Sequence, residues 1–235
     1  MRRLLPLYLV IFVGFLGYSL MITVFTPLLL DDSTGMLPAS TSTSTRAIVL
    51  GALLSLYPLG QFLGSPVLGT LSDRFGRRPV LLVSLASTTV WYAVIALALA
   101  AESLPLLMIA CFLAGLSEAN IVIAQGAIAD AAPREDRGRL FGYIYLSASL
   151  AYVAGPLGGG KLADSGLVSW FTESTPYWVV FGLLLITLAW VAMVFRETHA
   201  PDRSAPIRWL DALTSLRGVV TRRDLRAFYL ANFLL

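Results

Sequence analysis

Residues 69–79 read Gly69-Thr-Leu-Ser-Asp-Arg-Phe-Gly-Arg-Arg-Pro79, a charged stretch that separates two long apolar runs, residues 47–68 and 80–100. Each run is long enough to cross a bilayer, because about 20 apolar residues in a helix span the hydrocarbon core. The stretch is therefore expected to be a tight turn that joins two membrane helices. Gly69 and Gly76 are expected to allow close backbone approach or positive φ, and Pro79 suits the first turn of the second helix.

The composition is that of a polytopic membrane protein. Hydrophobic residues make up 57% of the 235 residues and charged residues only 13%, against about 25% charged residues in a soluble domain. The single cysteine, Cys111, excludes an internal disulfide, and the single histidine, His199, leaves zinc without a ligand set. The sequence contains no Gly-rich phosphate loop of a primary pump. We therefore expect neither a cofactor nor a metal.

Six apolar stretches predict an all-α fold, a six-helix transmembrane bundle over residues 1–195. The expected helices cover residues 4–30, 46–68, 79–100, 104–129, 140–162 and 176–195. The first stretch is too long for a signal peptide, whose apolar region is about 7–15 residues, so we interpret it as a retained helix. The Ser- and Thr-rich segment 31–45 is expected to be a flexible external loop.

The last part of the chain is polar and then turns apolar again. Residues 196–226 form an internal linker in which four apolar residues have the spacing of a short interfacial helix: Trp209, Leu210, Leu213 and Leu216. Residues 227–235 begin another apolar run, which we interpret as the start of a seventh helix in a truncated chain. A second polypeptide that supplies the remaining helices is the alternative.

The Lys and Arg residues are distributed unevenly across this topology. Fifteen of the 17 fall in segments on one side, and only Arg46 and Lys161 fall on the other. Because Lys and Arg near helix ends resist translocation, the richer side is predicted to be cytoplasmic, with the N-terminus inside. The same asymmetry accounts for the net charge of +3 without a nucleic-acid partner.

The quoted stretch also has a recognisable pattern. Gly69, Leu71, Asp73, Arg74, Gly76, Arg77 and Arg78 resemble the signature between the second and third helices of the major facilitator superfamily of secondary transporters. The resemblance implies that residues 1–226 are an N-terminal half whose partner is a C-terminal six-helix half. It also implies that Asp73, Arg77 and Asp130 lie close together and brace an inner gate. The alternative, solvated loop charges that contribute little individually, predicts that they are separated.

The fifth predicted helix resembles the antiporter motif of the same superfamily. Its matching positions are Gly142, Gly155, Pro156 and Gly159, with Ala151 where a glycine is usual. Proline bends a helix and small residues allow neighbouring helices to approach closely. The resemblance implies a role in bending and sealing the cavity, whereas a packing kink is the plain alternative.

Glu118 is the only carboxylate within a predicted span. A charge there costs about 2.5–3.5 kcal/mol or more, so such residues normally face a cavity or a partner. A carboxyl in that position can bind and release a proton. Cys111, Gly115, Glu118, Val122 and Gln125 share one helix face, which is expected to line a cavity. A satisfied structural hydrogen bond is the alternative for Glu118.

Other polar residues in the spans are weaker candidates for substrate or proton binding. They are Tyr57 and Gln61 on the second helix, Asn120 on the fourth, and Tyr145 and Tyr152 on the fifth. Asn120 lies off the face of Glu118, so an interhelical hydrogen bond is its preferred interpretation. Tyrosines and amides also serve routinely as contacts between membrane helices.

Residues 115–130 and 137–142 are similar to the tetracycline-exporter-like branch of drug:proton antiporters. Two positions depart from that branch. Phe15 stands where an acidic residue is common in the first helix, and Cys111 stands where an arginine is common in the fourth. If protons are coupled, Glu118 must substitute for the usual pair.

The function expected is secondary active transport of a small organic solute, by proton-coupled antiport or efflux, in a bacterial inner membrane. The partners are then the lipid bilayer and the solute, and the proton gradient supplies the driving force. A facilitator or proton-coupled importer is the first alternative. A membrane sensor or assembly subunit without transport is the second. None of these functions is enzymatic.

Overall fold

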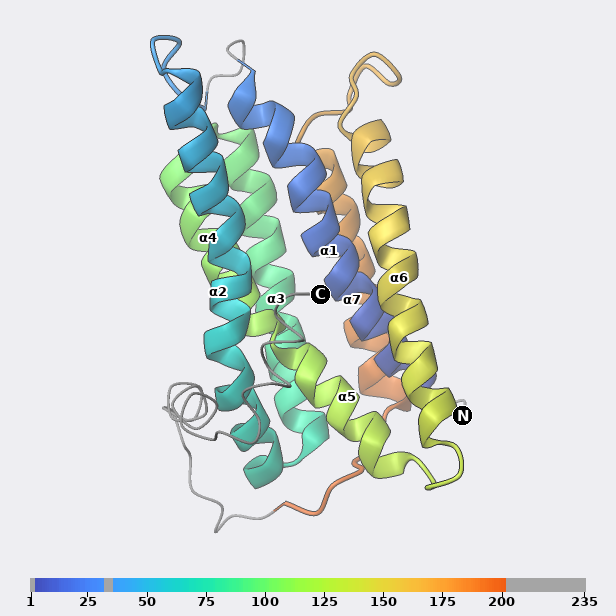
Figure 1. Ribbon diagram of the computed structural model, residues 1–235. Coiled ribbons are helices and arrows are strands. Elements are labelled where there is room, and N and C mark those ends of the chain that lie inside the picture. The colour runs from blue at the N-terminus through green and yellow to red at the C-terminus, as the bar shows by residue number, and fades with distance from the viewer. Residues whose placement is uncertain (1–2, 32–35, 202–235) are drawn as a thin grey trace, which may run out of the picture.

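The computed structural model describes residues 3–31 and 36–201, and this part of the chain is a bundle of helices without strands (Figure 1). The helices, in chain order, are α1 (Leu5–Leu30), α2 (Thr43–Phe75), α3 (Arg77–Ala100), α4 (Leu104–Glu118), α5 (Asn120–Ala131), α6 (Arg137–Leu162) and α7 (Thr175–Val194). Within the described ranges, six spans are long and apolar enough to cross a membrane, and α4 and α5 together form one of them. The all-α class and the six predicted spans are confirmed.

The helix ends differ from the prediction at the charged stretch. The prediction ended the second helix at Leu68 and began the third at Pro79, but α2 continues to Phe75 and α3 begins at Arg77. A helix can continue through charged residues where it leaves the membrane, because water and neighbouring charges stabilise their side chains. The expected turn is therefore a break at one residue, Gly76.

The fourth span is not the continuous helix that was predicted. It breaks at Ala119, whose φ of −55° and ψ of −3° end α4, and α5 starts at Asn120. Figure 1 shows α5 running in a different direction from α4, toward the start of α6. The break lies directly after Glu118, which is the last residue of α4.

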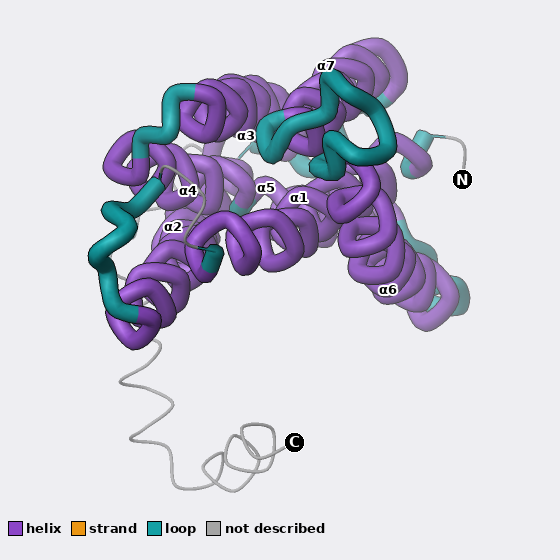
Figure 2. The backbone as a smooth tube through the Cα atoms, turned by 90° about the horizontal axis from the view of Figure 1, so that it is seen from above, coloured by secondary structure: helices purple, strands orange, loops and turns teal. Residues whose placement is uncertain are grey.

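α1 lies at the centre of the bundle. It packs along α6 and also contacts α2, α5 and α7, while α4 packs against both α2 and α3. In the view from above, α2, α3 and α4 cluster on one side of α1 and α6 and α7 on the other (Figure 2). α2 and α6 are the least buried spans and expose apolar side chains, including Ile48, Phe62, Leu146, Val153 and Leu157.

The connection between α1 and α2 is held by a buried cation, Arg46. Its side chain is 1% exposed, and its guanidinium donates to the carbonyl oxygens of Leu29, Pro38 and Thr41 at 3.2, 3.1 and 3.3 Å. The expected loop over residues 31–45 is shorter than predicted, because residues 43–45 belong to α2, and Arg46 holds two of its carbonyl groups, those of Pro38 and Thr41. The predicted interfacial helix around Trp209 and the predicted seventh helix over 227–235 lie outside the described residues.

Candidate functional site

The junction between α2 and α3 depends on Gly76. Its φ of +100° is a conformation that other residues rarely adopt. Its N–H donates to the carbonyl of Ser72 at 2.9 Å and ends α2. A Cβ here would also lie 2.5 Å from Oε2 of Glu197. The prediction is confirmed for Gly76 but wrong for Gly69, which lies inside α2 with open space around it.

Arg77, the first residue of α3, lies between two carboxylates. Its Nη1 is 2.9 Å from Oδ1 of Asp73, and its Nε is 3.1 Å from Oδ2 of Asp130 at the end of α5. Nη1 also donates to the hydroxyl of Ser72 at 2.7 Å. The predicted closeness of Asp73, Arg77 and Asp130 is confirmed. The cluster joins the ends of α2, α3 and α5.

Glu197 completes this cluster from beyond the end of α7. Its carboxylate accepts hydrogen bonds from the backbone N–H groups of Arg77 at 2.9 Å and Arg78 at 3.0 Å, the first two residues of α3. It also accepts from Thr198 and His199 at 3.0 and 3.1 Å. Burial raises the pKa of the carboxyl, and the four N–H donors lower it more, so its pKa lies below the usual glutamate value.

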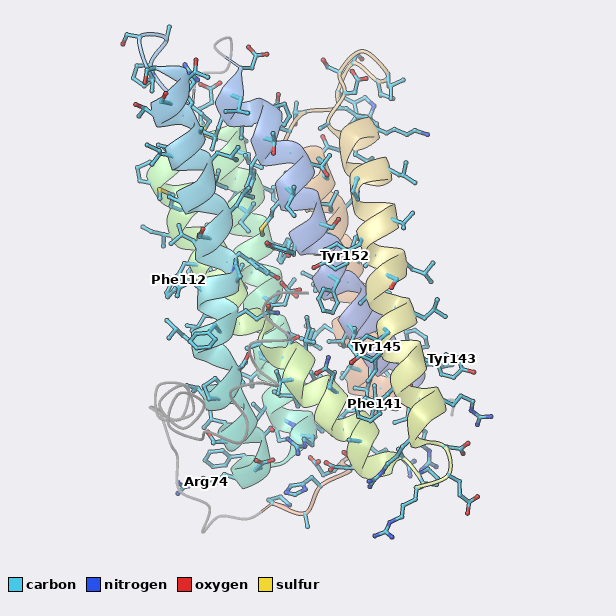
Figure 3. All side chains as sticks on the ribbon, in the orientation of Figure 1. Arg74, Phe112, Phe141, Tyr143, Tyr145 and Tyr152 are labelled. Carbon is cyan, nitrogen blue, oxygen red and sulfur yellow. The ribbon has the colours of Figure 1, made fainter. Side chains whose placement is uncertain are left out.

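The other charged residues of the motif have different roles. Arg78 donates to the carbonyl of Ala192 at 2.8 Å and so ties α3 to the end of α7. Arg74 lies over the ring of Phe75, 5.6 Å from its centroid, and points away from the bundle (Figure 3). His199 approaches the cluster, with Nδ1 3.9 Å from Oδ2 of Asp130. We call Asp73, Arg77, Asp130 and Glu197 the junction cluster.

The antiporter-like segment of α6 packs against α1 through its small residues. A Cβ on Gly155 would lie 2.5 Å from Oγ of Ser19, and one on Gly159 would lie 2.5 Å from Cδ2 of Leu20. Ala151 is fully buried, whereas Pro156 is exposed within the continuous helix. Gly142 has open space around it and makes no such contact. The segment therefore brings α1 and α6 into close contact, while its role in transport remains a prediction.

Glu118 is buried at the centre of the bundle, with 1% of its surface exposed. Its Oε2 accepts a hydrogen bond from the hydroxyl of Tyr92 on α3 at 3.3 Å. Its Oε1 lies against α1, where a Cβ on Gly14 would be 2.8 Å away. No Lys, Arg or His in the described ranges forms an ion pair with this carboxyl.

The predicted cavity-lining face of the fourth span is not maintained. Cys111, Gly115 and Glu118 point into the packed interior, whereas Val122 is 39% exposed and Gln125 is half-buried. The break at Ala119 interrupts the helical periodicity on which the prediction depended. Asn120 is buried and donates to the hydroxyl of Thr88 at 3.4 Å, which confirms its interpretation as an interhelical contact.

A pocket of about 230 Å³ lies beside Glu118, between α1, α2, α5 and α6. Two aromatic pairs wall it: the rings of Tyr18 and Tyr57 are stacked 5.3 Å apart, and those of Phe15 and Tyr152 are 5.7 Å apart. Gln61, Gly14 and Ile121 also line the pocket. We call this the aromatic pocket. A larger groove of about 710 Å³ between α2, α3 and α4 has no titratable side chain among its described lining residues.

The aromatic pocket brings together some of the predicted candidates and excludes others. Tyr57, Gln61 and Tyr152 line it, whereas Gln125 does not and Tyr145 is 72% exposed on α6 (Figure 3). The hydroxyl of Tyr57 is buried and has no hydrogen-bond partner within residues 3–31 and 36–201. Tyr18 was not among the predicted candidates, and Phe15 was noted only as a departure from the tetracycline-exporter-like branch. Their spacing of one helical turn on α1 was the available signal.

The pocket and the buried carboxyl share a wall. Gly14 lines the pocket on one side and lies against Oε1 of Glu118 on the other, and a Cβ at this position would also lie 2.9 Å from Cδ1 of Ile121. A molecule in the pocket and a proton on Glu118 would therefore be separated by little more than the backbone of α1. This arrangement can link occupancy of the pocket to protonation of the carboxyl.

Known proteins share both the sequence and the fold. A sequence model of the Major Facilitator Superfamily matches residues 7–235. The chain is 39% identical over 168 residues to the class C tetracycline resistance protein of Escherichia coli, and 36% identical over 148 residues to the class B protein. These matches cover 71% and 63% of this chain but only 40% and 35% of the relatives, so the chain spans about half the length of a relative or less.

A solved structure of a human organic anion transporter has the same fold. It superposes with a TM-score of 0.66 at 22% identity, over 91% of this chain and 54% of that protein. The matching sequence model establishes the family, and the six spans with this shared fold establish a multi-pass membrane protein. The chain belongs to the major facilitator superfamily.

Proposed function

We propose that the chain is the N-terminal half of a secondary active transporter that exports a small organic solute in exchange for protons, by alternating access. The position of Glu118 carries the proposal. Its carboxyl is buried without a counter-cation in the described ranges and lies directly behind the wall of the aromatic pocket. A proton-coupled cycle needs a group that is neutral when occluded and charged when water reaches it, and a membrane-buried carboxyl meets that need.

The solute that fits the pocket is planar and aromatic. Two aromatic pairs provide faces for stacking, and the amide of Gln61 provides hydrogen bonds. Relatives named as tetracycline resistance proteins support a drug-like solute of this kind.

The transporter lies in a bacterial inner membrane with its arginine-rich end in the cytoplasm. Arg74, Arg77, Arg78, Arg134, Arg137 and Arg139 all belong to the Gly76 end of the bundle, which supports this orientation. The junction cluster then braces the cytoplasmic side of the bundle. The transmembrane proton gradient supplies the driving force, and no cofactor is needed.

Glu118→Gln tests the proposal, because glutamine preserves the size of the side chain but cannot ionise. We expect the variant, in a full-length transporter that carries these helices, to lose proton-driven accumulation in vesicles. Counterflow exchange of the same solute should persist. The matched control is Glu102→Gln, in the exposed turn between α3 and α4, which should leave both activities unchanged.

The two assays separate the alternatives. Driven accumulation that survives in Glu118→Gln removes this residue from proton coupling and contradicts the proposal. A wild-type protein that equilibrates a solute but never concentrates it is a facilitator. Absence of both accumulation and exchange for every planar aromatic solute tested indicates a membrane protein that does not transport this class.

A further inference from the structure

Tyr92 is the only described residue that forms a hydrogen bond with the side chain of Glu118. Both side chains are buried, with exposures of 0% and 1%, and the hydroxyl donates to Oε2 at 3.3 Å across the interface between α3 and α4. A hydroxyl in this position can donate to the carboxyl in either protonation state, because Oε2 keeps a lone pair in both. The contact can therefore persist through a proton-binding cycle.

α1 presents glycine at both places where it covers this pair. A Cβ on Gly14 would lie 2.8 Å from Oε1 of Glu118, and one on Gly17 would overlap the hydroxyl of Tyr92. No side chain of α1 could occupy either place with the pair in its present position. The backbone of α1 therefore closes over the carboxyl and the hydroxyl together.

We infer that Tyr92 is a positioning residue that holds Oε2 of Glu118 on the α3 side, so that Oε1 faces Gly14 and the aromatic pocket. The proton then exchanges on the side of the carboxyl where the solute binds. Without the hydroxyl, the carboxyl rotates freely about its last side-chain bond and its two oxygens become equivalent. This inference rests on the proposed function of Glu118 as the proton-binding group.

The chain offers a matched control in Tyr177 on α7. Its side chain is also 0% exposed and stacks on Phe25 with ring centroids 5.7 Å apart, but its hydroxyl has no hydrogen-bond partner among the described residues. Tyr92→Phe and Tyr177→Phe therefore remove the same atom from equally buried rings. Only the first removes a contact with Glu118.

Infrared spectroscopy of the 235-residue chain tests the contact directly. The spectrum of the wild type minus that of Glu118→Gln isolates the stretching band of the Glu118 carboxyl. The same subtraction in a Tyr92→Phe background isolates the Glu118 carboxyl band when the Tyr92 hydroxyl is absent. We expect the band to shift to higher frequency and broaden in Tyr92→Phe, because a hydrogen bond to a carboxyl oxygen lowers its stretching frequency. Tyr177→Phe should leave the band in place.

Transport by a full-length protein that carries these helices tests the consequence. We expect Tyr92→Phe to lower proton-driven accumulation about tenfold, the upper end of what one hydrogen bond between neutral groups contributes, while counterflow exchange persists. A merely structural role would lower both activities together. Tyr177→Phe should leave both unchanged.

The outcomes distinguish the inference from the proposed function. An unshifted carboxyl band in Tyr92→Phe, or unaltered driven accumulation in that variant, overturns the role of Tyr92 even if Glu118→Gln is inactive. Driven accumulation that survives in Glu118→Gln overturns the proposed function instead, and the infrared band still reports whether Tyr92 holds the carboxyl.

Discussion

Arg77 and Asp130 are 53 residues apart in the sequence, yet Nε of the first lies 3.1 Å from Oδ2 of the second. The contact joins the start of α3 to the end of α5. Arg77 is only 13% exposed, so its charge is partly withdrawn from water and depends on the two carboxylates beside it. Such a pair contributes more than an exposed one, and the loss of one partner leaves the other uncompensated.

Asp73→Asn should impair transport while leaving expression intact. The substitution removes the charge that lies 2.9 Å from Nη1 of Arg77 and leaves that guanidinium with Asp130 alone. Solute uptake and membrane expression should be measured together. Asp136→Asn is the control, because the carboxylate of Asp136 forms an exposed pair with Arg139 at 3.1 Å and no other ion pair in the described part of the chain. Wild-type transport by Asp73→Asn would show that the cluster has no bracing role.

Glu197→Gln should lower the midpoint of thermal unfolding at neutral pH and not at acid pH. The folded-state pKa of Glu197 is lowered, so the stability that its charge provides is present above the ordinary glutamate value, about 4.3, and is lost as the pH falls through the folded-state value. A charge at a helix N-terminus typically contributes about 0.3–1 kcal/mol.

Unfolding scans across that pH range, with Glu173→Gln as the control, measure this effect. Glu173 is exposed in the connection between α6 and α7, and its carboxylate accepts no hydrogen bond from any residue in the described part of the chain. A difference between the wild type and Glu197→Gln that is constant with pH would mean that the charge of Glu197 is not what stabilises α3.

Gly155→Ala should destabilise the bundle and Gly158→Ala should not. A Cβ on Gly155 would lie 2.6 Å from Cβ of Ser19, so α1 and α6 must separate, and overpacking of this kind costs about 1–3 kcal/mol. Gly158, on the same helix, has open space and should gain slightly from alanine, by about 1 kcal/mol or less. Thermal stability in detergent measures both. Equal stabilities would mean that α1 and α6 are not held in this contact.

Two single cysteines should report the orientation in a Cys111→Ser background. Ser40 is exposed near the start of α2, and Glu135 is exposed between α5 and α6 at the other end of the bundle. An impermeant maleimide should label Ser40→Cys in intact cells and Glu135→Cys only after permeabilisation. The reverse pattern would place the arginine-rich end outside.

The spans were predictable from the sequence because their apolar length alone identifies them. Their ends were not predictable at Phe75, since Asp73 and Arg74 look like loop residues, although the backbone hydrogen bonds of α2 continue through them as far as Gly76. The residues at the break, Glu118, Ala119 and Asn120, include no glycine or proline, so the local sequence did not predict a helix end there.

The site was partly predictable for a related reason. A motif with fixed spacing identified Arg77 and its carboxylates, and the cost of a charge in a membrane identified Glu118. Contacts between segments far apart in the sequence produce no comparable sequence pattern. Glu197 meets Arg77 across 120 residues, and Tyr92 meets Glu118 across 26. The same is true of the pocket, whose aromatic walls come from three separate helices.

The attachment of Glu197 to α3 has a mechanical consequence. Because its carboxylate holds the N–H groups of Arg77 and Arg78, the polypeptide that follows α7 is fastened to the junction at Gly76 before it continues past Pro201. A force on the following chain is therefore first borne by the start of α3 and only then by α7. The segment after α7 is therefore connected to the rest of the bundle at two places, the end of α7 and the start of α3.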